Sequence, residues 1–136
     1  MTYVPSDPPV VPYLMVRDGH AALDWYVRAF GGREIVRYDT DDGRLGHAML
    51  ELANGGAIYL SGEFVEETVG TRAPGTLGGT TFTVALAVDD ADAWMARAEA
   101  EGAVVIRPVT DEFFGRNGKL RDPFGHVWSM TGPKRG

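Results

Sequence analysis

Apolar and polar residues follow one another in an order that occurs twice along the chain. Residues 12–38 and residues 83–109 each contain a short apolar run, an amphipathic stretch that begins at Asp, a Gly-containing stop and a second apolar run with β-branched residues. A matching order over segments of this length predicts two copies of one supersecondary unit.

A helix pattern follows the first apolar run of each copy. Asp18 suits the N-cap of the first helix, and the Gly-Gly pair at 31–32 ends the pattern. Asp89 or Asp90 suits the cap of the second helix, and Gly102 ends it. Apolar residues between these signals recur at helical spacing and predict one buried face on each helix. They are Ala22, Trp25, Tyr26, Ala29 and Phe30 in the first helix, and Ala91, Trp94, Met95 and Ala98 in the second.

Three strand patterns follow each helix, separated by turn signals such as "DTDDGRLG" and "ANGG". Each unit therefore reads strand, helix, strand, strand, strand. Two such βαβββ modules predict an α+β fold, a curved eight-stranded mixed sheet with helices on its outer face and an open trough on the other. The predicted strands after the helices are 33–38, 46–52 and 57–61, then 104–110, 118–121 and 126–131.

The predicted single domain takes in residues 1–136. Module one covers about 10–61 and module two about 80–132, with residues 62–79 between them. This intervening stretch is rich in Gly, Thr and Glu. A stretch of this length is either a linker or a flap over the trough, and the linker is preferred.

Composition and charge exclude several classes of protein. The net charge of −6 argues against nucleic acid as a partner, because phosphate binding needs clustered Lys and Arg. The absence of Cys excludes disulfides, thiolate metal sites and cysteine nucleophiles. Without an apolar run long enough to span a bilayer or a signal-peptide pattern at the start, no membrane association is expected, and the expected location is cytoplasmic.

Three motifs carry a family resemblance. "AALDWYVRAFGG", "GHAMLEL" and above all "DEFFGRNGKLRDPFGHVWSM" resemble the vicinal oxygen chelate superfamily, which includes glyoxalases, bleomycin resistance proteins and dioxygenases. Within it the tail is most similar to the PhnB-like branch. The resemblance covers nearly all of residues 10–132, and it implies the paired-module fold.

The resemblance also implies where the enzymes of this superfamily hold a metal ion. Aligned by strand register, the four positions are Val11, Tyr59, Thr83 and Ser129, and none is His or a carboxylate. Metal-binding relatives commonly end in Asp-Pro-x-Gly-His-x-x-Glu, where the Glu is a ligand and Ser129 stands here. We therefore expect neither a metal nor another cofactor.

Strand alternation assigns His126 and His47 to opposite faces of the predicted sheet. His126 shares a face with Trp128 and Met130, which should pack on the helices, so we interpret it as a structural histidine of the turn. His47 and Glu51 should face the trough, but they lie about 13 Å apart along a strand and cannot bind one ion together. His47 could serve as a base or hydrogen-bond donor, or this face could simply be solvated.

The trough is predicted to bind a small molecule, because it combines apolar and aromatic side chains with a few polar groups. Phe114 and Arg116 are placed at its rim, before an Asn-Gly turn at 117–118. Candidate catalytic residues are His47 and Glu51. The predicted ligand-binding residues are Tyr13, Met15, His47, Met49, Tyr59, Thr83, Phe114, Arg116 and Ser129.

The preferred function is sequestration: the protein binds a small aromatic or cationic ligand without a metal, as resistance proteins of the superfamily do. A homodimer is expected. One alternative is a metal-dependent lyase, isomerase or dioxygenase with an atypical site. Another is an interaction module whose trough is filled by its own aromatic side chains.

Overall fold

A computed structural model describes residues 7–64 and 71–136 of the chain. None of the helices within these residues is both long and apolar enough to cross a membrane. The elements of the first module are β1 (Tyr13–Val16), α1 (Gly19–Phe30), β2 (Arg33–Asp39), β3 (Leu45–Glu51) and β4 (Ala57–Gly62). After α2 (Pro74–Leu77), the second module contains β5 (Thr83–Ala87), α3 (Ala91–Ala100), β6 (Val104–Glu112), β7 (Gly115–Arg121) and β8 (Val127–Gly132).

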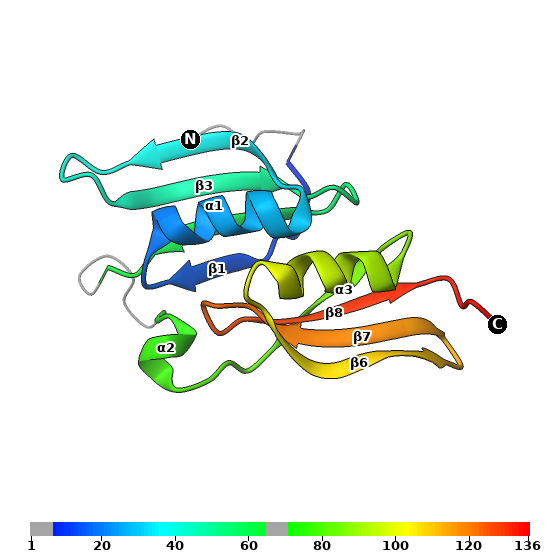
Figure 1. Cartoon of the computed structure of the whole chain (residues 1–136). Helices are drawn as coiled ribbons and strands as arrows, with labels where there is room; N and C mark the ends of the chain where they lie inside the picture. Colours follow the sequence, from blue (N-terminus) through cyan, green and yellow to red (C-terminus); the bar gives the residue numbers. More distant parts are fainter. Residues whose placement is uncertain (1–6, 65–70) are drawn as a thin grey trace.

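The strands form two sheets of the same topology. Sheet A has the order β1-β4-β3-β2 and sheet B the order β5-β8-β7-β6, with a parallel first pair and antiparallel pairs after it. Figure 1 shows α1 lying across sheet A and α3 across sheet B, on the same side of the molecule. The predicted α+β fold of two βαβββ modules is thus confirmed, with the eight strands hydrogen-bonded as two sheets of four.

Local sequence signals set the ends of both long helices. The Asp18 carboxylate accepts a hydrogen bond from the Ala21 amide at 3.1 Å, and Asp90 caps α3 in the same way. Gly31 has a φ of 62°, and a Cβ there would lie 2.8 Å from the Cβ of Ala53. The stop of α1 therefore needs glycine for two reasons, its left-handed backbone and the close approach of the next loop.

The apolar faces of the two helices meet in one core that both modules share. The rings of Phe30 on α1 and Trp128 on β8 lie 4.7 Å apart between centroids, and Phe30 also stacks on Trp94 of α3 at 5.8 Å. Among the described residues no strand pairs across the two sheets, so the large apolar area that these aromatic side chains bury helps to join the modules.

A buried carboxylate fastens the same junction. Asp122 lies between β7 and β8 with 3% of its surface exposed. One carboxylate oxygen accepts hydrogen bonds from the Tyr26 hydroxyl and from Trp128 Nε1, the latter at 2.8 Å. The other accepts from the backbone amides of Phe124 and His126, at 2.8 and 3.0 Å. Burial and the neighbouring carboxylate raise the pKa of Tyr26 well above its ordinary value. Asp122 is therefore a structural anion that connects α1 to the second module.

His126 is buried on the same face as Trp128 and Met130, as strand alternation predicted. Its Nε2 donates a hydrogen bond to the backbone carbonyl of Met15 at 2.8 Å, while Nδ1 has no hydrogen-bond partner among the residues described. The side chain thus links the start of β8 to β1, which supports the structural interpretation of this histidine.

The segment between the modules lies against β1. Residues 65–70 of the predicted linker fall outside the described part of the chain, but Glu63 accepts hydrogen bonds from the Ala73 amide and the Thr76 hydroxyl, both at 2.8 Å. Gly125, at a φ of 95°, lets Pro74 approach so closely that a Cβ at Gly125 would lie 2.6 Å from it. These contacts hold α2 beside the C-terminal end of β1 (Figure 1), where Arg17 Nε also donates a hydrogen bond to the Thr76 hydroxyl at 3.1 Å.

Candidate functional site

Three aromatic side chains gather on the open face of sheet A, the face that α1 does not cover. Tyr13 on β1, His47 on β3 and Tyr59 on β4 alternate with buried residues of their strands, so all three point away from the core. Their ring centroids lie 5.1–5.4 Å apart, and the Tyr13 hydroxyl is 2.7 Å from His47 Nδ1 in a hydrogen bond. We call these residues the Tyr–His–Tyr cluster.

Asp7 adds an anion to the Tyr–His–Tyr cluster. The Tyr59 hydroxyl donates a hydrogen bond to its carboxylate at 3.1 Å. Partial burial, followed by the hydrogen bond and charge of Asp7, raises the pKa of Tyr59. The pKa of His47 is lowered because burial outweighs the attraction of Asp7 for the protonated ring. His47 is therefore a neutral hydrogen-bonding group at neutral pH.

This balance predicts how His47 titrates. We expect the NMR titration of its ring protons to have a midpoint below the ordinary 6.5, and Asp7→Asn to lower the midpoint further by removing the favourable charge. Because the fold favours the neutral ring, the contribution of His47 to stability is full above pH 6.5 and is lost as the pH falls through its folded pKa. Asp24→Asn on α1 is the matched control, and an upward shift in Asp7→Asn would contradict the assignment.

A cavity of about 130 Å³ opens beside Tyr13 and extends toward sheet B. The Phe82 and His126 rings lie 6.3 Å apart at its far side. The cavity therefore lies between β1 and the segment that carries α2. Its lining residues are Tyr13, Met15, Thr71, Arg72, Pro74, Leu77, Gly79, Thr80, Thr81, Phe82 and His126.

The open face of sheet B carries amide and hydroxyl groups instead of aromatic rings. Asn117 on β7 is 1% exposed and donates from its amide to the hydroxyls of Ser129 and Thr131, each at 2.9 Å. Its carbonyl oxygen accepts from the Arg107 guanidinium. Thr83 is exposed on β5, where it pairs with Val127. Ser129 and Thr83 thus lie on the predicted face, on the other sheet from the Tyr–His–Tyr cluster.

The predicted Asn-Gly turn at 117–118 is wrong. Both residues lie inside β7, and the turn falls at Phe113 and Phe114. Asn117 is satisfied by cross-strand partners, and a Cβ at Gly118 would come within 2.8 Å of the Val109 side chain. The glycine therefore serves close packing rather than chain reversal.

The shifted turn moves Phe114 and Arg116 from their predicted places. Phe113 and Phe114 are 91% and 53% exposed at the turn, 5.1 Å apart between ring centroids. The Arg116 guanidinium donates two hydrogen bonds to Asp92 of α3, at 2.6 and 3.2 Å. Its predicted position at the trough rim is wrong, because its side chain lies on the helix side of sheet B.

The remaining predicted residues lie on sheet A. Met49 is half-buried opposite Tyr59, beside the Tyr–His–Tyr cluster. Glu51 ends β3 and pairs with Arg33 of β2 at 3.0 Å, so it is already neutralised. The sequence interpretation missed Asp7, since no strand pattern surrounds it, and it also missed Phe82 and His126, which line the cavity with Tyr13.

The strand register changes one of the four positions that the resemblance implied for a metal. The β1 residue opposite Tyr59 is Tyr13, whereas Val11 precedes the strand. Across residues 7–64 and 71–136, no three side chains of His, Asp or Glu come together in a way that could hold a metal ion. The expectation of a metal-free site stays a prediction.

Comparison with known proteins gives consistent results. Residues 9–130 match the Glyoxalase/Bleomycin resistance protein/Dioxygenase superfamily. An uncharacterized Mycobacterium tuberculosis protein, Rv0887c, is 40% identical over 131 residues, which are 95% of this chain and 76% of that protein. The crystal structure of TioX from Micromonospora sp. ML1 is similar with a TM-score of 0.72 and 31% identity, covering 93% of this chain and 98% of TioX. A PhnB protein from Bacillus cereus shares the fold at 17% identity, with a TM-score of 0.68 and coverage of 91% and 98%.

Proposed function

The chain belongs to the glyoxalase/bleomycin resistance protein/dioxygenase superfamily, and we propose that it is a metal-free protein that binds and sequesters a small molecule. The observation that carries the proposal is the Tyr–His–Tyr cluster beside the cavity at β1. In this cluster, aromatic rings and hydroxyl groups occupy the open face where enzymes of the superfamily place metal ligands.

The chemistry of the cluster favours an aromatic ligand, with or without a positive charge. Tyr13 and Tyr59 offer ring faces and edges for stacking, and the carboxylate of Asp7 lies next to them. His47 has a lowered pKa, so it adds a hydrogen bond without repelling a cation. Such a combination of apolar rings and few polar groups is typical of small-molecule sites.

The proposal includes a homodimer in which a second chain completes the pocket and covers open sheet edges. Support comes from the two outer strands, which expose apolar side chains on both sheets. These are Ile35, Val36 and Tyr38 on β2, and Val104 and Ile106 on β6. The carbonyl and amide groups at such edges are also available for association between chains.

A thermal-shift screen of aromatic and cationic compounds tests the proposal on the full chain. A ligand present at about 100 times its Kd stabilises a protein by about 2.7 kcal/mol, which raises Tm by several degrees. Sedimentation velocity of the same preparation should show a dimer, and elemental analysis after purification without chelators should show no bound metal. Stoichiometric Zn, Ni, Mn or Fe, or a broad panel without any stabilising compound, would count against the proposal.

A further inference from the structure

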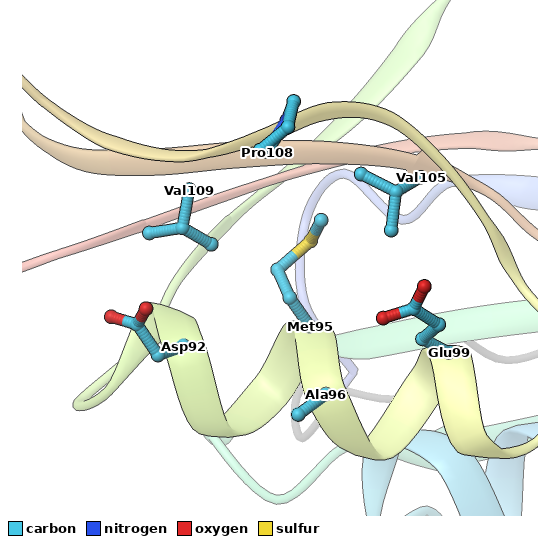
Figure 2. A pocket seen from close by; sticks show the side chains of 7 residues that line it. All are labelled: Asp92, Met95, Ala96, Glu99, Val105, Pro108 and Val109. Carbon is cyan, nitrogen blue, oxygen red and sulfur yellow. The ribbon is translucent and has the colours of Figure 1, made fainter.

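A second hollow lies far from the Tyr–His–Tyr cluster, on the helix side of sheet B. It is a cleft of about 430 Å³ between α3 and β6. Figure 2 shows Met95 reaching from α3 toward β6, with Asp92 and Glu99 on either side of it along the helix. The walls of the cleft are formed by Asp92, Met95, Ala96 and Glu99 of α3 and by Val105, Pro108 and Val109 of β6.

The sequence explains why helix and strand leave this space. Ala96 lines the cleft with only a methyl group, so a larger side chain at this position would fill part of the gap. β6 is also irregular, with register shifts on either side of Arg107, and it contains Pro108. Bulges and proline bend an edge strand and break its regular pairing, so the strand does not close over the helix.

The two carboxylates at the ends of the cleft differ in their surroundings. Asp92 is paired with Arg116 at 2.6 Å and with Arg135 at 3.4 Å, and its pKa is lowered chiefly by the hydrogen bond from Arg116. Glu99 makes no ion pair and no side-chain hydrogen bond with any residue in the described ranges, and it is exposed. The Glu99 end of the cleft therefore carries an uncompensated negative charge, whereas the charge of Asp92 at the other end is balanced by arginine. At a rise of 1.5 Å per residue, the two carboxylates are about 10 Å apart along the helix.

We propose that this cleft binds an amphiphilic organic cation, with its hydrocarbon or aromatic body on Met95, Val105 and Val109 and its ammonium group at Glu99. The apolar walls supply the area to bury, and the free carboxylate sets the orientation of the ligand. The site is separate from the Tyr–His–Tyr cluster, because the cluster lies on the open face of sheet A and the cleft lies on the helix side of sheet B. Its existence does not depend on the proposed sequestration function.

The test uses 4-phenylbutylamine and its neutral counterpart 4-phenylbutanol, titrated into the full-length ¹⁵N-labelled protein at pH 7. We expect amide shifts at residues 92–99, 105–107 and 109, and weaker binding of the alcohol. Glu99→Gln should weaken binding of the amine about three- to fivefold, as for a solvent-exposed ion pair, and should remove the preference over the alcohol. Ala96→Trp should weaken both compounds more than about tenfold by filling the cleft.

Two controls separate these effects from general ones. Asp24→Asn on α1 removes the same charge elsewhere and should leave the affinity unchanged, and Ala21→Trp adds the same bulk to an exposed position of α1. The amide spectrum of each variant reports whether it is folded. The proposal is overturned if the amine shifts no cleft residue at millimolar concentration, if the shifts map to Tyr13 and His47 instead, or if Glu99→Gln binds the amine as tightly as the wild type.

Discussion

Asp122→Ala is expected to lower the free energy of unfolding by about 3–5 kcal/mol, the cost of breaking a buried, charged hydrogen-bond network. The substitution removes the acceptor for two backbone amides, for Trp128 Nε1 and for the Tyr26 hydroxyl. All of these donors would stay buried without partners, and the link between α1 and the second module would be lost. Urea denaturation followed by tryptophan fluorescence measures the change.

Two further variants divide this effect. Tyr26→Phe removes a single donor and should cost about 1–3 kcal/mol, whereas Asp24→Asn on the exposed side of α1 should stay within about 0.5 kcal/mol of the wild type. An Asp122→Ala protein as stable as Asp24→Asn would mean that the carboxylate is not a structural element. The Asp-Pro turn at 122–123 would then have to be stabilised by other contacts.

Tyr13→Ala is expected to weaken binding of any ligand found by thermal shift about 10- to 100-fold, the effect of removing a central aromatic anchor. Tyr13 contacts both His47 and Tyr59 and lines the cavity, so its loss removes a ring face and a wall together. Because its surface is 44% exposed, stability should fall by only about 1 kcal/mol. Isothermal titration with purified ligand measures the affinity.

The aromatic control for this variant lies on sheet B, at the turn between β6 and β7. Phe113→Ala removes a ring that is 91% exposed at the turn between β6 and β7, and it should not change the affinity. Tyr13→Phe keeps the ring and removes only the hydroxyl that bonds to His47, so a loss of about three- to tenfold is expected. Unchanged binding in Tyr13→Ala would move the ligand away from the Tyr–His–Tyr cluster.

The two modules share a fold but differ in what their open faces offer. Sheet A presents aromatic rings beside the Asp7 carboxylate, whereas sheet B presents hydroxyl and amide groups organised by Asn117. This division of chemistry agrees with a duplicated unit whose core positions are similar and whose open-face positions differ.

Sequence periodicity alone predicted most of the fold. The spacing of Trp25, Tyr26 and Phe30, the cap at Asp18 and the stop at 31–32 define α1, because a helix and its ends depend on residues close together in the chain. The alternation of apolar and polar residues likewise assigned His47 to the open face and His126 to the helix-facing side. These inferences hold because side chains alternate strictly between the two faces of a strand.

Only the tertiary structure decided which distant residues meet. Asp122 finds its hydroxyl partner 96 positions away, at Tyr26, and Asp7 meets Tyr59 from 52 positions away. Asn117 carries a local turn signal that is overridden by partners on β8 and β6, and the cleft at Glu99 depends on how β6 bends. Local patterns specify the elements, whereas these contacts depend on how the elements pack and on the burial that makes each polar group need a partner.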